Sequence, residues 1–213
     1  MDKKRPTYTR RIILAFILAT VIFSSIFLIT YMFSYTKYSS LLMSQERIKY
    51  NLLSLDLERQ LLSSSCDTFN PHLLSSELNN IGSIVGILED RFGKQDEKVL
   101  EQKKIYTMLE VQHFLLINDY NNKCEGNIQN ILFFYSNQEE FKESAEKIGY
   151  ILSSIKNNNP EIMIYSFDYD LDSNLIEILK NKYFIEKPNT LVINQKTTVS
   201  MIKNIEDIEN HLN

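Results

Sequence analysis

The stretch whose layout best suits chemistry is "NILFFYSNQEEFKESAEKIG", residues 130–149. An apolar run, Ile131–Tyr135, is followed by a short polar turn and then by a helical pattern that begins with acidic residues. The N-terminus of a helix offers unpaired amide N–H groups and the positive end of the helix dipole, and both stabilise an anionic reactive group. The sequence therefore predicts a candidate site at this strand–helix junction, formed by Asn137, Glu140 and Glu143.

Helix capping explains these three residues without catalysis. Asn137 stands three residues before Glu140, which is the spacing of a capping box in which each side chain satisfies a backbone N–H group of the other residue. Carboxylates in the first turn also interact favourably with the helix dipole. A catalytic carboxylate pair is the alternative, but no His, Lys or nucleophilic hydroxyl is placed to complete a mechanism. We therefore expect no catalytic residue here.

Two further patterns resemble metal sites only in part. Asp168, Asp170 and Asp172 alternate as in the first half of a calcium loop, but Ser173 stands where such a loop needs glycine and Leu179 where it needs a bidentate glutamate. Three isolated histidines do not match the spacing of a zinc site, namely His72, His113 and His211. The sequence therefore predicts no metal and no other cofactor.

The chain has two cysteines, Cys66 and Cys124. If three helices run out, back and out again between residues 36 and 126, both cysteines fall at the same end of that helical region. We therefore predict a structural disulfide, which would stabilise the fold by about 4 kcal/mol for a loop of this length. A redox-active pair is the alternative, but widely separated cysteines provide no local attacking and resolving partners.

Residues 12–35 form an uncharged apolar segment long enough to cross a bilayer as a helix. A cleaved signal peptide is the alternative, but its apolar region would be shorter and would end in small residues rather than in Tyr31, Met32, Phe33 and Tyr35. We therefore expect an uncleaved single-pass anchor. Tyr31, Tyr35 and Tyr38 would lie at the outer membrane interface.

The charge distribution orients this segment. The first eleven residues contain five basic side chains against Asp2, a net charge of +4, and the total of −4 leaves −8 for the rest of the chain. The positive-inside rule then places residues 1–11 in the cytoplasm and everything after the span outside, in an oxidising compartment. The acidic remainder argues against a nucleic-acid partner.

Residues 36–126 are predicted to form a three-helix antiparallel region. Leu41, Ile48, Leu55 and Leu62 recur every seven residues on the first helix, which continues the membrane helix outward. The second helix ends at Gly93, and Asp96 caps the third. Gly82 and Gly86 lie inside the second helix and indicate a close helical neighbour. A parallel coiled-coil homodimer is the alternative for the first helix.

Residues 127–213 show a different pattern, with strands and helices in the order βαβ, α, ββα. Strands are predicted at 131–135, 162–167, 190–193 and 198–202, with helices containing Phe141–Ile155, Leu175–Leu179 and Ile205–Leu212. The βαβ unit requires a parallel pair, and the last two strands are close enough for an antiparallel hairpin through Asn194 and Gln195. The sequence therefore predicts an α/β domain with a mixed four-stranded sheet and flanking helices.

This order, with "ILFFYSN" leading into a helix and "YFIEKPNTLVIN" before the closing hairpin, resembles the thioredoxin-like family over residues 129–213. In that family a Cys-x-x-Cys pair occupies the N-terminus of the helix after the first strand, where a thiolate is stabilised. Glu140 and Glu143 stand at the corresponding positions here. The resemblance thus implies a thioredoxin-like domain that has no redox pair.

The family also has a cis-proline directly before the third strand, beside a groove that binds peptides. Pro188 is displaced by one residue, because Asn189 separates it from Thr190. The resemblance implies a groove beside Pro188, a cis Lys187–Pro188 bond if the family pattern holds, and a degenerate site that comprises Asn137, Glu140, Glu143 and Pro188.

Our leading hypothesis is a membrane-anchored extracytoplasmic protein whose redox-inactive thioredoxin-like domain binds a protein partner or acts in assembly. The alternative is a thiol–disulfide oxidoreductase or chaperone-like protein of the cell envelope, which would use Cys66 and Cys124 or the cysteines of a partner. A third hypothesis is a dimeric stalk in which the distal domain is a spacer.

Overall fold

The structure is a computed structural model that describes residues 6–62, 66 and 71–212. Side chains are described at residues 8–32, 50, 53–57, 60, 66, 75, 76 and 78–212. The chain divides into two units, 1–47 and 48–213. The predicted cytoplasmic Lys3–Arg5 cluster lies outside the described residues, as do the side chains of Tyr35, Tyr38 and most of the seven-residue repeat.

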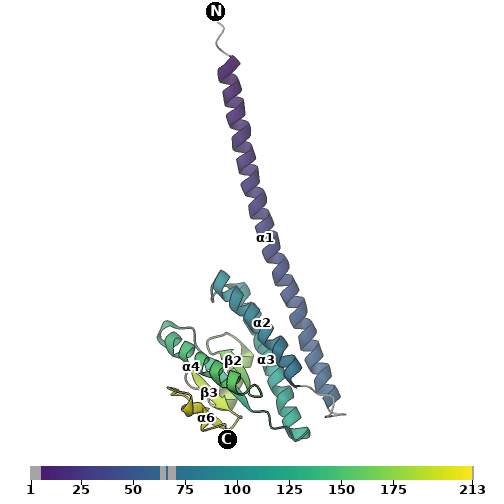
Figure 1. Cartoon of the computed structure of the whole chain (residues 1–213), viewed down its shortest axis with the longest axis vertical. Helices are drawn as coiled ribbons and strands as arrows, with labels where there is room; N and C mark the ends of the chain where they lie inside the picture. The colour runs from purple at the N-terminus through teal and green to yellow at the C-terminus, as the bar shows by residue number, and fades with distance from the viewer. Residues whose placement is uncertain (1–5, 63–65, 67–70, 213) are drawn as a thin grey trace, which may run out of the picture. The chain divides into compact units, whose positions relative to one another are not determined.

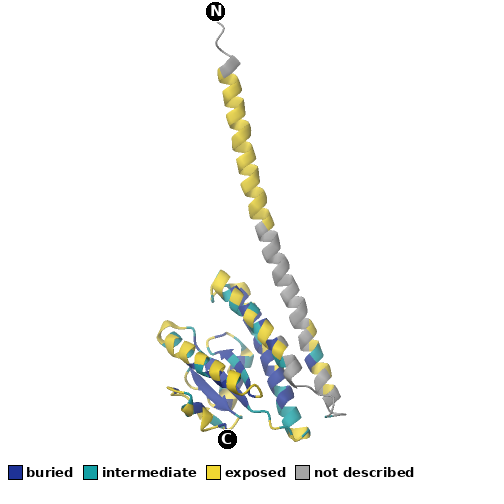
Figure 2. Ribbon diagram, in the orientation of Figure 1, coloured by how far each residue is buried: buried dark blue, intermediate teal, exposed yellow. Residues whose placement is uncertain are grey.

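The first unit consists of the N-terminal part of helix α1 (Pro6–Leu62). Within Tyr8–Met32 an 18-residue window of this helix reaches a mean hydropathy of 2.9, and none of that window is buried; Figure 2 colours this part of the ribbon as exposed. Thr20 and Thr30 donate their hydroxyls to carbonyls four residues earlier, at 2.8 and 2.9 Å, so these polar groups are satisfied within the helix. By length and composition the segment is consistent with a signal anchor or a signal sequence.

The second unit begins with the end of α1, where Leu55 is buried against α2 (Pro71–Phe92) and α3 (Glu97–Lys123). These two helices pack side by side (Figure 1). Gly93 ends α2 with a φ of 89°, and the Asp96 carboxylate caps α3 by accepting from the amides of Lys98 and Val99. Both predicted helix boundaries are confirmed.

The glycines of α2 differ in their surroundings. A Cβ at Gly82 would lie 2.7 Å from the Tyr106 hydroxyl of α3, whereas a Cβ at Gly86 would meet no atom of the described residues within 4 Å. The expected close helix neighbour therefore exists at Gly82 and not at Gly86.

A mixed four-stranded sheet follows, in the order β2-β1-β3-β4. Strand β1 (Asn130–Tyr135) pairs in parallel with β2 (Met163–Asp168) and antiparallel with β3 (Thr190–Ile193), which pairs antiparallel with β4 (Thr197–Val199). Helix α4 (Glu139–Asn158) connects the parallel pair, and α5 (Asn174–Tyr183) precedes β3. The predicted mixed sheet is confirmed.

Each face of the sheet has its own core, because alternate side chains of a strand point to opposite faces. Ile131 and Phe133 of β1 pack with α4 and α6 (Glu206–Glu209), whereas Leu132 and Phe134 pack with α3 and α5. Figure 2 shows the sheet as the most buried layer. β1 is therefore buried on both faces, as its continuous apolar run indicates.

Two predicted elements are shorter than expected. β4 was expected to reach Ile202 but ends at Val199, and the last helix is the single turn α6. Ile202 is nevertheless buried with Ile208 in the core beneath α4. The apolar pattern there reflects burial of a connecting segment rather than strand pairing.

Candidate functional site

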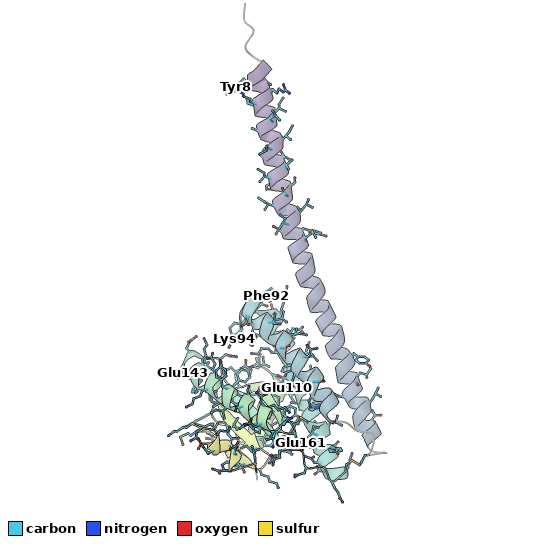
Figure 3. All side chains as sticks on the ribbon, in the orientation of Figure 1. Tyr8, Phe92, Lys94, Glu110, Glu143 and Glu161 are labelled. Atoms are coloured by element: carbon cyan, nitrogen blue, oxygen red, sulfur yellow. A yellow bond between two sulfur atoms is a disulfide. The ribbon has the colours of Figure 1, made fainter. Side chains whose placement is uncertain are left out.

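The N-terminus of α4 is not capped as the sequence predicts. Gln138 is the N-cap residue and makes no side-chain capping bond, so the capping box of Asn137 with Glu140 is wrong. Glu140 and Glu143 are exposed, and Glu143 points to solvent from the first turns of α4 (Figure 3). Glu140 lies in the first turn together with Glu139, where its charge interacts favourably with the helix dipole.

Asn137 instead joins three elements. Its Oδ1 accepts from Lys94 Nζ at 2.7 Å, and its Nδ2 donates to Asp168 Oδ2 at 3.1 Å. Lys94 follows α2 and Asp168 ends β2. Tertiary contacts with residues distant in sequence therefore outcompete the local capping interaction.

Asp168 belongs to a buried charge cluster. Lys103 of α3 donates to Asp168 Oδ2, and its Nζ lies 2.8 Å from Glu89 Oε1 of α2. Burial by itself lowers the pKa of a lysine, but the carboxylates of Asp168 and Glu89 outweigh it and raise the pKa of Lys103. Lys103 therefore stays charged, and the three groups hold α2 and α3 against the end of β2.

A cleft of about 540 Å³ opens beside this cluster. Its floor is Phe133, Tyr135 and Ile164 of the sheet, and α2 and α4 contribute its walls. Lys156 of α4 lines it, and burial lowers the pKa of its amine. Its Nζ donates to the Pro160 carbonyl at 2.7 Å, so it satisfies a backbone acceptor just after the C-terminus of α4.

Pro188 lies in a different place from Asn137. The described residues contain no cis peptide bond, so Lys187–Pro188 is trans, and the cis bond implied by the family pattern is wrong. The next residue, Asn189, is the unusual one. It is buried and adopts the left-handed region with a φ of 56°, which asparagine tolerates better than most residues.

Asn189 ties the start of β3 to the junction of β1 and α4. Its Oδ1 accepts from the amide of Ser136 at 3.3 Å, and its Nδ2 donates to the Phe141 carbonyl at 2.8 Å and to Ser144 Oγ. The side chain therefore occupies the space between the first turn of α4 and the strand opposite. No single local motif in the sequence signals this role.

A second groove, of about 460 Å³, lies beside Pro188. Its lining includes Phe141 and Ser144 of α4, together with Thr198 of β4 and Ser200 and Met201 after it. Phe184 and Met201, both in its lining, are 85% and 84% exposed. The groove thus offers apolar side chains and the start of an edge strand at one surface. Of the predicted site residues only Pro188 lines it; Asn137 lines the first cleft, and Glu140 and Glu143 line neither.

A buried carboxyl protects the other edge of the sheet. Glu110 Oε1 of α3 accepts from the amide of Ser166 at 2.8 Å on edge strand β2. Burial, against the hydrogen bonds from Ser166 and Tyr106, raises the pKa of Glu110 to about 8. Nearby, His113 Nδ1 lies 2.8 Å from the Tyr165 hydroxyl. His113 is a buried core residue.

The aspartates of the calcium-like stretch bind protein groups. Asp168 takes part in the Lys103 cluster, and Asp170 accepts from Ser136 Oγ at 2.5 Å and from Gln138 Nε2 at 2.7 Å. Within the described residues, no three His, Cys, Asp or Glu side chains gather in a way that could hold a metal ion.

Cys66 and Cys124 form the predicted disulfide, with a Cα–Cα distance of 5.6 Å. It joins the segment between α1 and α2 to the C-cap of α3, so a covalent bond links the two ends of the α2–α3 pair. The bond is remote in sequence from the α4 junction.

Comparisons with protein-family models, with curated proteins and with solved structures find no match to this chain.

Proposed function

We propose that this protein is a single-pass, membrane-anchored extracytoplasmic protein whose thioredoxin-like domain, residues 127–213, binds an extended apolar segment of another protein without redox chemistry. The observation that carries the proposal is the groove beside Pro188 with the exposed side chains of Phe184 and Met201. A solvent-exposed pair of large apolar residues beside a hollow is costly unless a partner covers it.

The strand order β2-β1-β3-β4, with a parallel pair joined by α4 and an antiparallel hairpin, supports the thioredoxin-like assignment. Both cysteines are used in the disulfide that joins the segment after α1 to the C-cap of α3, and the first turn of α4 contains no cysteine. The junction where a thiolate would lie is instead held by Asn189. These contacts favour a rigid binding surface over a site that must exchange disulfides.

The proposed location rests on two features. The apolar helix 8–32 is long enough to span a bilayer, and positive charge precedes it in the sequence. The disulfide supports an oxidising compartment for the rest of the chain. Protease added to intact cells should therefore digest the C-terminal domain; complete protection until the cells are lysed would contradict this topology.

The binding test uses phage-displayed random peptides panned against the full-length protein in detergent micelles. We expect enrichment of peptides with apolar side chains, and an at least tenfold weaker affinity for Phe184→Ser and Met201→Ser. Tyr150→Ser is the matched control, because Tyr150 is 77% exposed on α4 and lines neither groove. Enriched peptides that bind the two groove variants unchanged would overturn the proposal.

A homodimer through α1 is a separate assembly hypothesis. Sedimentation of the full-length protein in micelles at the mass of one chain would contradict the homodimer hypothesis.

A further inference from the structure

A third hollow, of about 410 Å³, lies at the opposite end of β1 and β3 from the junction of α4. Eight of its eleven lining residues carry carboxamide side chains, and one, Lys196, is charged. They come from the end of α3, from the connection to β1 and from the turn between β3 and β4. Such a concentration of neutral donors and acceptors is unlike the lining of the other two hollows.

The amides are held in place by one another. Asn118 Oδ1 accepts from Gln195 Nε2 at 2.9 Å and from Asn130 Nδ2 at 3.3 Å. Asn194 Oδ1 accepts from the amide of Asn130 at 3.0 Å, and its own amide donates to the Asn130 carbonyl at 2.8 Å. Asn194 and Gln195 both have positive φ, which fixes the turn that carries them. The orientation of the amide groups is therefore preorganised.

Some of these amides have a purely structural role. Asn121 donates to the Ile128 carbonyl and accepts from its amide, at 2.7 and 3.0 Å, so it satisfies the backbone between α3 and β1. Asn121 is therefore not assigned to ligand binding.

Asn130 differs from Asn121 in one respect. Asn130 is only 3% exposed, it lines the hollow, and its Oδ1 has no hydrogen-bond partner within the described part of the chain. A buried acceptor without a donor is destabilising, and native proteins rarely keep one unless a ligand or water supplies the donor. Beside it, Asn118 Oδ1 already accepts two hydrogen bonds, and its Nδ2 group can donate to an acceptor in a ligand.

A hydroxyl group suits this pair, because it can both donate to an oxygen such as Asn130 Oδ1 and accept from an amide such as Asn118 Nδ2. The remaining amides offer further donors and acceptors, whereas the described lining residues include no carboxylate side chain to bind a cation and no cluster of basic groups to bind an anion. We infer that this hollow binds a neutral, hydroxyl-rich carbohydrate. Its volume falls within the range of small-ligand sites.

The test is ligand-observed saturation-transfer NMR on the full-length protein, with maltose and N,N′-diacetylchitobiose as separate probes at millimolar concentration. The micelles must be zwitterionic, since detergents with sugar head groups would compete. We expect saturation transfer to at least one probe and an at least tenfold lower affinity in Asn130→Ala and in Asn118→Ala. Gln195→Ala provides a third variant at an exposed position if Asn130→Ala does not fold.

Two controls separate this site from others. Asn181→Ala removes an exposed amide that lies outside the hollow, and Phe184→Ser alters the groove beside Pro188; both should bind the probe as the unaltered protein does. Absence of saturation transfer from both probes would overturn the inference, as would transfer that is unchanged in Asn118→Ala and Gln195→Ala. Either result would mean that the amides only hold ordered water.

Discussion

Removal of the positive charge of Lys103 should destabilise the second unit more than any other single lysine substitution on α3. Lys103 is 4% exposed, and it is the cation shared by Asp168 and Glu89. Lys103→Met keeps the length of the side chain but leaves two carboxylates in a buried environment with no cation. Removing one partner of a buried ion pair costs about 3–5 kcal/mol, because the remaining charge has been taken out of water without compensation.

Lys104→Met is the matched control on the same helix. Lys104 lies 3.0 Å from Glu101, but both side chains of that pair are substantially exposed, so solvent screens the interaction. We expect a cost of about 0–1 kcal/mol. The contrast between adjacent lysines isolates burial from charge.

The measurement is urea denaturation of residues 48–213, followed by circular dichroism, for the two single variants and for Lys103→Met combined with Asp168→Asn. The second substitution removes one of the stranded charges and keeps an oxygen that accepts from Asn137. The double variant should therefore be less destabilised than the sum of the single variants, by about 0.5–3 kcal/mol. A cost for Lys103→Met below about 1 kcal/mol, equal to that of Lys104→Met, would refute the reasoning.

Three further predictions concern the same unit. Gly82→Ala should destabilise it by about 1–3 kcal/mol by displacing the Tyr106 hydroxyl, whereas Gly86→Ala should stabilise it by about 0.5–1 kcal/mol; equal midpoints in urea would contradict the difference in their surroundings. Glu110 stays protonated up to about pH 8 in the folded protein but loses its proton near pH 4.5 in the unfolded chain. The free energy of unfolding should therefore fall by up to ~5 kcal/mol as the pH rises from 4.5 to about 8. Glu110→Gln should remove that fall, and a pH profile that this variant leaves unchanged would contradict it. Cys66→Ser should lower the free energy of unfolding by about 2–5 kcal/mol. We expect no insulin-reducing activity in the unaltered protein or in this variant; activity that is present in the unaltered protein and lost in Cys66→Ser would support the oxidoreductase alternative.

The sequence determined the features that depend on local pattern. The apolar helix, the strand order along the chain, the turn at Asn194–Gln195 and the caps at Gly93 and Asp96 follow from hydrophobic periodicity and from residues with special backbone preferences. The disulfide also followed, because helix lengths placed both cysteines at one end of the helical region.

The tertiary structure decided what the polar residues do. Asn137 has the right spacing for a capping box, yet Lys94 and Asp168, 43 and 31 residues away, take its side chain. Asn130 directly precedes the strand predicted at 131–135, and only the fold brings it to Asn118 and Asn194. A buried polar side chain pairs with an available donor or acceptor within reach. The packing of the elements, rather than the order of residues along the chain, decides which partner that is.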